Sequence, residues 1–297
     1  MQELNKSALL IINPVSGKKQ VLKYIPNIIR SLMNGGYAPT VMVTGSRGEA
    51  TEFARDYGAR YDLVCCTGGD GTLNETLSGL AMADIHVPLG YIPCGSTNDF
   101  AMSHALALDI PTAAANIASG RRTVYDIGSF GDEYFSYVAA FGAFSWLAYT
   151  TDQNLKNVLG HTAYILDGIK DLSKIKPIHM RFTADGVVHE DDYIFGAVSN
   201  SLSIAGTIEM PKNLVDTCDG IFELLLVKTP KTIVELNGAV NALLTQSFQH
   251  PCVELFQAKN IIAESNEPIE WALDGERSAA YQSVEIRPIH KFLELQG

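Results

Sequence analysis

Residues 68–72 read Gly68-Gly69-Asp70-Gly71-Thr72 and lie between an apolar run at 62–66 and a helix-like stretch at 73–81. Three glycines allow the backbone to approach a ligand closely and to turn its N–H groups toward phosphate oxygens. The N-terminus of the following helix adds donors and a favourable dipole. A plain turn with Thr72 as the N-cap would look similar, but it would not require the Asp70 carboxylate. The stretch therefore predicts an α/β unit with a phosphate-binding loop.

The same alternation continues along the first 125 residues. Apolar runs at 8–12, 40–44, 62–66 and 87–92 are separated by helix-like stretches at 20–33, 49–57 and 73–81, and another helix is expected to begin near Asn98. Strand–helix alternation at this spacing predicts βαβ units, with a parallel sheet covered by helices. We expect an α/β domain over residues 1–125.

The pattern changes after residue 125. Short β-rich runs now dominate, at 135–139, 178–183, 193–198, 222–227, 252–257 and 283–286. Ala184-Asp185-Gly186 is typical of a hairpin turn, and helical patterns are found at 159–172 and 231–244. A second, mostly antiparallel β-rich domain is therefore expected over residues 126–285.

The composition narrows the classes of function. The chain has 297 residues, 46% of them hydrophobic, a net charge of −11 and five cysteines. Nucleic acid is not expected as a partner, because binding its backbone needs clustered Lys and Arg. The cysteines have no metal-binding spacing, and we expect reduced thiols. No apolar run is long enough to span a bilayer and no signal peptide is recognised, so a cytoplasmic protein is expected.

Three further loops carry polar residues at the ends of predicted strands: Asn13–Gly17, Thr44 and Gly95–Asp99. Turn or helix-cap chemistry explains each loop by itself. In a parallel sheet, however, the carboxyl ends of the strands meet at one edge, where ligands bind. Four such loops on one edge favour a nucleotide site. The loop at 68–72 lacks the lysine of a Walker A sequence and the spacing of a Rossmann fingerprint, so neither is predicted.

These motifs resemble those of a known family. Asn13-Pro14-Val15-Ser16-Gly17, Gly68-Gly-Asp-Gly-Thr-Leu-Asn-Glu75 and Gly95-Ser-Thr-Asn-Asp-Phe-Ala101 are similar to the three nucleotide-binding motifs of bacterial diacylglycerol kinase-like lipid kinases. Asp216-Thr-Cys-Asp-Gly-Ile-Phe222 resembles the segment of that family that holds a structural magnesium ion, and Leu273-Asp-Gly-Glu276 resembles its catalytic motif. The resemblance covers nearly the whole chain.

The resemblance implies a two-domain fold. The N-terminal α/β domain, of the NAD kinase/diacylglycerol kinase-like type, would bind ATP. The C-terminal β-sandwich domain would meet the lipid acceptor, with the active site between the two domains. The last residues, about 286–297, would return to complete the first domain.

The resemblance also implies roles for individual residues. ATP contacts would fall on Asn13, Pro14, Ser16, Gly17, Thr44, Gly68, Gly69, Asp70, Gly71, Thr72, Asn74 and Ser96. The position of Ser96 is usually threonine, and here either Ser96 or Thr97 could supply the hydroxyl. The catalytic set would be Asp274 as general base, Glu276 beside it, and Asp70 and Asp99 organising magnesium and water. A structural magnesium would be held by the Asp219 side chain and the main-chain oxygens of Asp216 and Ile221.

Asp274-Gly275-Glu276 has two interpretations from its residues alone. Gly275 allows one sharp turn to present two carboxylates, which phosphoryl transfer uses to orient the attacking hydroxyl and to hold magnesium. Asp-Gly is also the commonest sequence signal of a hairpin turn. The family pattern is what favours a catalytic role here.

The expected function is that of an ATP-dependent lipid kinase, a transferase of lipid metabolism and phospholipid biosynthesis. It would use Mg²⁺ and transfer the γ-phosphate to the hydroxyl of diacylglycerol or a related lipid alcohol. The expected partners are ATP and a membrane lipid, with transient peripheral contact at the inner face of the membrane, and a homodimer is a possible assembly. The alternatives are NAD kinase, which also carries a Gly-Gly-Asp-Gly-Thr loop, and a nucleotide- or lipid-binding regulator without turnover.

Overall fold

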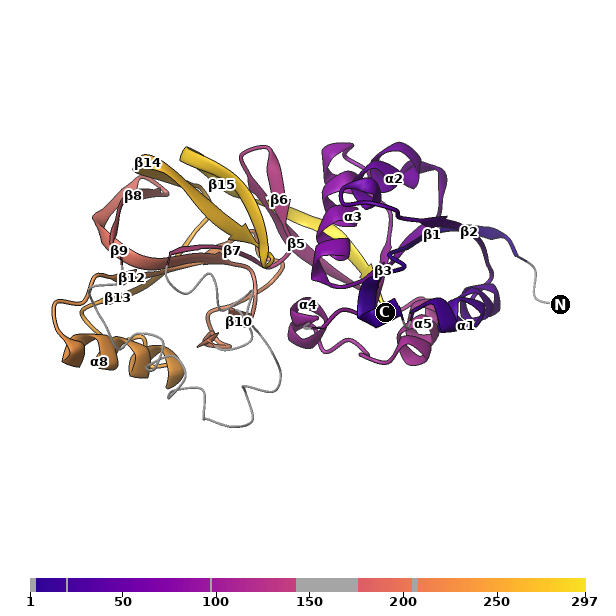
Figure 1. The fold of residues 1–297 in the computed structure, drawn as a ribbon, viewed down its shortest axis with the longest axis horizontal. Helices are drawn as coiled ribbons and strands as arrows, with labels where there is room; N and C mark the ends of the chain where they lie inside the picture. The colour runs from indigo at the N-terminus through magenta and orange to yellow at the C-terminus, as the bar shows by residue number, and fades with distance from the viewer. Residues whose placement is uncertain (1–3, 20, 97, 143–175, 205–207) are drawn as a thin grey trace. The chain divides into compact units, whose positions relative to one another are not determined.

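The computed structural model describes residues 4–19, 21–96, 98–142, 176–204 and 208–297. The chain divides into two compact units (Figure 1): Met1–Ile127 with His290–Gly297 form unit 1, and Gly128–Ile289 form unit 2. The chain therefore crosses from one unit to the other twice. Each unit is described by itself below.

Unit 1 contains a parallel sheet. Its strands are β1 (Lys6–Ile12), β2 (Tyr37–Val43), β3 (Leu63–Gly68) and β4 (Leu89–Pro93), in the order β2-β1-β3-β4. The end of β15 (Glu276–Gln296) adds a further parallel strand, through pairing of Leu295 with Leu89. Every residue of β3 and β4 is buried, because helices cover both faces of the sheet. The predicted parallel sheet is confirmed.

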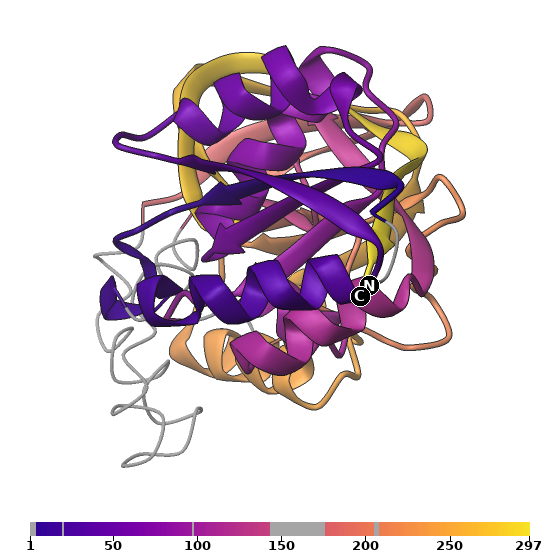
Figure 2. The same cartoon turned by 90° about the vertical axis from the view of Figure 1, so that its right-hand side faces the viewer.

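Two pairs of helices cover this sheet (Figure 2). Helices α1 (Val21–Asn34) and α5 (Ile110–Ser119) pack on one face, and α2 (Glu49–Tyr57) and α3 (Asp70–Met82) on the other. The apolar side chains of α1 and α5 share a core with those of β1, β3 and β4. Three shorter helices complete the unit: η1 (Ser16–Lys19), η2 (Gly58–Arg60) and α4 (Asp99–Ser103).

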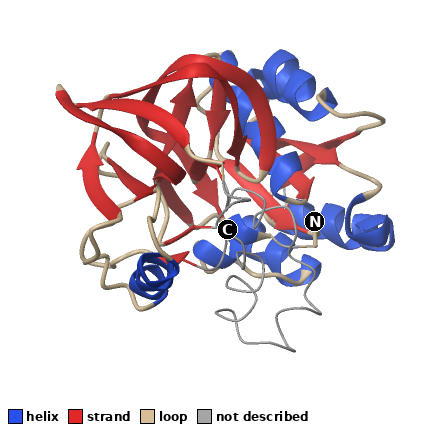
Figure 3. Cartoon of the chain, turned by 60° about the vertical axis from the view of Figure 1, so that its left-hand side comes forward, coloured by secondary structure: helices blue, strands red, loops and turns tan. Residues whose placement is uncertain are grey.

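Unit 2 is mostly antiparallel strand (Figure 3). Its strands are β5 (Arg122–Phe130), which begins in unit 1, β6 (Glu133–Phe135), β7 (Val138–Gly142), β8 (Ile178–Ala184), β9 (Val187–Ser199), β12 (Phe222–Lys228), β13 (Val253–Ala258), β14 (Ile261–Leu273) and the first part of β15. The order is β13-β12-β9-β7-β14-β15, and β8 pairs with both β9 and β14. A short ribbon, β10 (Ser203–Ile204) with β11 (Ile208–Glu209), and helix α8 (Ile233–Leu244) are added.

Aromatic side chains fill the core of unit 2. Trp271 contacts Phe130 and Phe141, with ring centroids 5.0 and 4.7 Å apart, and Phe141 stacks on Phe182. Phe141 is thus a core residue. Residues 143–175, which include Phe144, Trp146 and the predicted helix at 159–172, lie outside the described residues. No helix of the described ranges has the length and apolar character needed to cross a bilayer.

The predicted hairpin at 184–186 is confirmed. Ala184 pairs with Val187, and Asp185 and Gly186 have φ angles of 47° and 85°. Positive φ at both central residues is what a two-residue type I′ turn requires. The sequence did not predict β14, because its register shifts between Glu264 and Ile269 and this polar stretch interrupts the apolar alternation.

Candidate active site

The sheet register of unit 1 brings four predicted loops to one edge. Ile12 pairs with Val43 of β2 and with Thr67 of β3, and Gly68 pairs with Pro93 of β4. The strands therefore end at a common level. The loops that follow them contain Asn13–Gly17, Thr44, Gly69 and the β4–α4 connection. We call this region, where the sequence predicts nucleotide binding, the nucleotide edge.

Hydrogen bonds join the loops of the nucleotide edge. Asn13 Nδ2 donates to Thr72 Oγ1 at 3.0 Å, which links the loop after β1 to the first turn of α3. Ser16 Oγ donates to the Cys94 carbonyl oxygen at 3.3 Å. The buried Thr44 hydroxyl donates to the Ile12 carbonyl oxygen at 3.4 Å. These bonds hold backbone segments that are far apart in sequence in a fixed arrangement.

Two glycines are required by the close approach of these loops. A Cβ at Gly17, which has φ of 55°, would lie 2.3 Å from the Cys94 carbonyl oxygen. A Cβ at Gly68 would lie 2.3 Å from the Thr72 side chain. A side chain at Gly17 would push its loop away from Cys94, and one at Gly68 would displace Thr72 at the start of α3. Gly71 and Asn74 lie in the first turns of α3, Pro14 follows β1, and Ser96 is exposed; Thr97 is outside the described residues.

Asp70 connects two loops through its carboxylate. Its Oδ2 accepts the backbone N–H of Asp99 at 3.0 Å, and its Oδ1 accepts that of Phe100 at 3.2 Å. Both amides belong to the first turn of α4, whose N–H groups have no partner within the helix. Asp70, the first residue of α3, therefore fixes the start of α4 and places the buried Asp99 beside the glycine loop.

A row of aromatic rings lies beneath these two aspartates. Tyr91 Oη donates to the Gly68 carbonyl oxygen at 3.3 Å, and its ring contacts Phe100 edge-on. Phe100 stacks on His104 with centroids 4.1 Å apart, and His104 contacts Tyr125 edge-on. His104 Nδ1 donates to the Phe100 carbonyl oxygen at 2.8 Å. Burial raises the pKa of Tyr91, as do the Asp70 and Asp99 charges. Burial lowers the pKa of His104 to about 4.

Asp274 lies in unit 2, in the turn between β14 and β15. Leu273 pairs with Glu276, and Asp274 and Gly275 have φ angles of 51° and 84°. The Asp-Gly pair is thus a two-residue hairpin turn of the same kind as Asp185-Gly186. Asp274 is 3% exposed, whereas Glu276 at the start of β15 is exposed.

The Asp274 carboxylate is held by the segment 136–138. Its Oδ2 accepts the backbone N–H and the hydroxyl of Ser136, at 2.6 and 2.8 Å. Its Oδ1 accepts the N–H groups of Tyr137 and Val138, at 3.0 and 3.1 Å. Four donors therefore surround a buried carboxylate, and the hairpin turn is fixed to the connection between β6 and β7.

The predicted metal segment forms a turn before β12. Asp219 Oδ1 accepts the Ile221 N–H at 2.9 Å, and Asp216 Oδ1 accepts the Cys218 N–H at 3.1 Å. Asn200 Nδ2 donates to the Thr217 carbonyl oxygen at 3.3 Å. Within the described ranges, no group of three or more His, Cys, Asp or Glu side chains is arranged to hold a metal ion. A site here would thus have to draw on main-chain oxygens.

Glu223 lies just beyond this turn and is 1% exposed. Its Oε1 accepts a hydrogen bond from Gln257 Nε2 at 3.1 Å. Burial, and to a smaller extent the negative charges of Asp219 and Asp216, raise the pKa of Glu223 to about 7. Both aspartates therefore lie close enough to act on Glu223 electrostatically.

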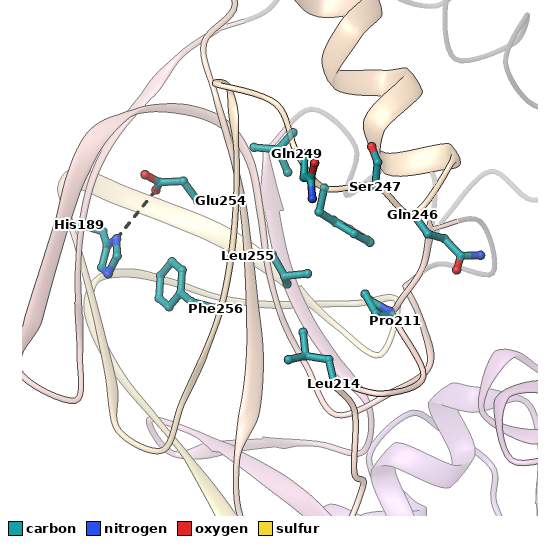
Figure 4. A pocket seen from close by; sticks show the side chains of 11 residues that line it. His189, Pro211, Leu214, Gln246, Ser247, Gln249, Glu254, Leu255 and Phe256 are labelled. Carbon is teal, nitrogen blue, oxygen red and sulfur yellow. Dashed lines mark ion pairs between the residues drawn. The ribbon is translucent and has the colours of Figure 1, made fainter.

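A cavity of about 520 Å³ opens beside β13 in unit 2 (Figure 4). Leu255 and Phe256 of the strand, Leu214, and Gln246 after α8 are among the residues that line it. None of the predicted site residues lines this cavity. It is therefore separate from the groups described above.

The structure adds residues that the sequence did not single out. Tyr91, His104, Ser136 and Glu223 each contact a predicted site residue or its segment. Tyr91, Ser136 and Glu223 are buried and His104 is partly buried, each as a single side chain within an apolar or mixed run. No local pattern marks such a residue, because its contacts come from segments far away in sequence.

The chain is similar to known proteins over most of its length. The diacylglycerol kinase catalytic domain family matches residues 7–130, and the YegS C-terminal NAD kinase beta sandwich-like domain family matches residues 142–292. A diacylglycerol kinase of Staphylococcus saprophyticus is 32% identical over 277 residues, 92% of this chain and 90% of the relative. One of Bacillus subtilis strain 168 is 30% identical, over 91% of this chain and 90% of the relative.

The fold agrees with these matches. A crystal structure of a candidate diacylglycerol kinase from Bacillus anthracis str. Sterne aligns with a TM-score of 0.80 at 25% identity, over 98% of this chain and 95% of that one. The second family model shares a fold name with NAD kinase, whereas the first model and the relatives that span both units are diacylglycerol kinases. The chain therefore belongs to the diacylglycerol kinase family of ATP-dependent lipid kinases.

Proposed function

We propose that the protein transfers the γ-phosphate of ATP to a hydroxyl group of diacylglycerol or a closely related lipid alcohol. The observation that carries this proposal is the pair of hydrogen bonds by which the Asp70 carboxylate holds the start of α4 at the nucleotide edge. The relatives of the chain are diacylglycerol kinases. Residues 1–125 with 286–297 bind the nucleotide, and residues 126–285 bind the lipid.

ATP binds at the nucleotide edge. The backbone N–H groups of Gly68–Gly71 and the N-terminus of α3 contact phosphate oxygens, because these groups are donors with a favourable dipole. The close approach at Gly17 and Gly68 supports this role, since it keeps the phosphate loops free of side chains. The remaining contacts come from Asn13, Pro14, Ser16, Thr44, Thr72, Asn74 and Ser96.

The residues fit a magnesium ion that accompanies ATP. Asp70 and Asp99 offer carboxylate oxygens next to the phosphate loop, and oxygen is the ligand that Mg²⁺ prefers. The two amide bonds of Asp70 fix its carboxylate at the start of α4, beside Asp99. When bound, the ion supplies neutralisation of the charge that develops on the transferred phosphoryl group.

Glu276 accepts the proton of the lipid hydroxyl. The sequence assigned this role to Asp274, but four donors occupy the oxygens of Asp274 and the carboxylate is buried. Glu276 is exposed at the end of the same turn. As the lipid oxygen bonds to the γ-phosphorus, its proton passes to the Glu276 carboxylate and the bond to the ADP oxygen breaks. Asp274 acts as the anchor that positions Glu276.

A second magnesium ion has a structural role at the turn before β12. The Asp219 carboxylate and the main-chain oxygens of Asp216 and Ile221 hold it, and such a small set suffices because Mg²⁺ retains several waters. The buried Oε2 of Glu223, which accepts no hydrogen bond from the described residues, supports a positively charged occupant nearby.

The enzyme works from the cytoplasm on a lipid in the inner face of the membrane. With a net charge of −11, its contact with an anionic membrane is transient and depends on a local surface. Diacylglycerol exposes its hydroxyl at the membrane surface, so brief contact of the protein with the membrane suffices for turnover.

The test is a product analysis. The full chain is incubated with γ-labelled ATP, MgCl₂ and vesicles that contain diacylglycerol, with NAD in a parallel reaction. We expect label in an organic-extractable phospholipid and unmodified NAD. Label in NADP would favour the alternative kinase, and ATP binding without any labelled product would favour a regulator.

A further inference from the structure

One buried carboxylate oxygen in unit 2 accepts no hydrogen bond within the part of the chain that the structure describes. Glu223 is the second residue of β12, and its Oε2 is buried and accepts no hydrogen bond from the described residues. A carboxylate oxygen can only accept while the group is ionised. Leaving such an atom unmatched in the interior costs stability, so a donor is expected at this position.

The surroundings of Glu223 carry further negative charge. Asp216 and Asp219, in the turn before β12, lie close enough to act on it electrostatically. Gln257 fixes the orientation of the group, because its Nε2 donates both to Glu223 Oε1 at 3.1 Å and to the Leu214 carbonyl oxygen at 2.8 Å. This leaves Oε2 as the oxygen that still needs a donor.

We propose that Glu223 belongs to the cation site of the 216–221 turn and accepts, through Oε2, a hydrogen bond from water bound to the cation. The inference rests on the structural cation proposed above. A hard divalent cation such as Mg²⁺ keeps several of its waters, and these waters are strong donors. One divalent ion thus offsets two of the three carboxylate charges, and its water satisfies the unmatched oxygen.

The test is a magnesium titration of thermal stability, with no nucleotide present. The full chain is freed of metal with EDTA, and Tm is followed against MgCl₂ at constant ionic strength. A ligand that binds only the folded state raises Tm, so wild type is expected to show a saturable rise. E223Q is expected to need a roughly 10-fold or greater MgCl₂ concentration for half of that rise, as for other residues that orient metal-bound groups.

Two variants provide the comparison. In E254Q, a carboxylate on the neighbouring strand β13 that pairs with Lys228 is neutralised, and the wild-type midpoint is expected. In D219A the rise of Tm with MgCl₂ is expected to disappear. Without magnesium, E223Q should melt at or above the wild-type Tm, because the amide removes a buried unmatched charge.

Three results would overturn the inference. They are a wild-type Tm that does not rise with MgCl₂, a midpoint of the Tm rise in E223Q that equals that of wild type, and a shift of the midpoint in E254Q as large as the shift in E223Q. Should E223Q not fold, E223D is titrated instead. It keeps the charge but withdraws the oxygens by one methylene, and a wild-type midpoint there would equally contradict the proposal. None of these measurements involves phosphoryl transfer, so failure of the kinase assay and failure of this test are distinguishable.

Discussion

Asp274 Oδ2 accepts two hydrogen bonds from one residue, Ser136, through its backbone N–H at 2.6 Å and its hydroxyl at 2.8 Å. Both residues are buried, and they are 138 positions apart. This pair fixes a hairpin turn near the end of the unit 2 sequence to the connection between β6 and β7, near its beginning. It supports the proposal that Asp274 anchors the turn and that the exposed Glu276 accepts the substrate proton.

The first prediction compares two Asp-Gly turns. Asp185 also accepts two backbone N–H groups, those of Lys259 and Asn260, but it is exposed. Asp274→Asn places an amide against N–H donors in the interior and should lower the free energy of unfolding by about 2–4 kcal/mol. Asp185→Asn, with solvent available, should cost less than ~1 kcal/mol. Urea unfolding of both variants measures the difference, and equal losses would contradict the anchoring role.

The second prediction concerns proton transfer. Glu276→Gln removes a proton acceptor from an exposed position, so turnover should fall roughly 10²–10⁴-fold while Tm stays unchanged. ATP affinity should also be retained, since the nucleotide loops belong to unit 1. The assay measures kcat with ATP and diacylglycerol vesicles. Nearly full turnover in this variant would return the role of base to Asp274.

A third prediction concerns the hydrogen bonds between Asp70 and the start of α4. Asp70→Asn replaces one acceptor by a donor that faces the start of α4, and it removes charge where magnesium is expected. Affinity for Mg·ATP should therefore fall at least about 10-fold, the cost of one charge-assisted hydrogen bond. The control is Asp109→Asn, a cap of α5 that accepts the Thr112 N–H and should leave the affinity unchanged. Calorimetric titration with ATP compares the two.

The fourth prediction is a pH dependence of stability. Burial lowers the pKa of His104 to about 4, whereas an unfolded histidine titrates near 6.5. Between these values the unfolded state binds more protons, so stability should fall as pH decreases from about 6.5 to 4, by up to about 3 kcal/mol.

His104→Phe keeps the stacking on Phe100 and removes the titrating group. The free energy of unfolding of this variant should depend less on pH in that window than wild type does. Denaturant unfolding at several pH values provides the measurement. If the two pH profiles run parallel, another group causes the acid loss of stability.

The sequence by itself determined the local features of this protein. Residue periodicity predicted the strand–helix alternation of unit 1, with α2 found at Glu49–Tyr57 as expected and α3 extending from Asp70 to Met82. Turn chemistry predicted the Asp185-Gly186 hairpin. These features depend on neighbours within a few residues, and the sequence lists those neighbours directly.

The tertiary structure decided which groups meet. Asp70 contacts amides 29 and 30 positions away, and Glu223 is oriented by Gln257, 34 positions away. Asp274 appeared in the sequence as a general base and in the structure is held by the 136–138 amides. Such contacts follow from strand order and register, which result from the packing of the whole unit. A local pattern contains the hydrogen-bonding groups but not their distant partners. For this reason only the fold distinguished the buried carboxylate of Asp274 from the exposed carboxylate of Glu276.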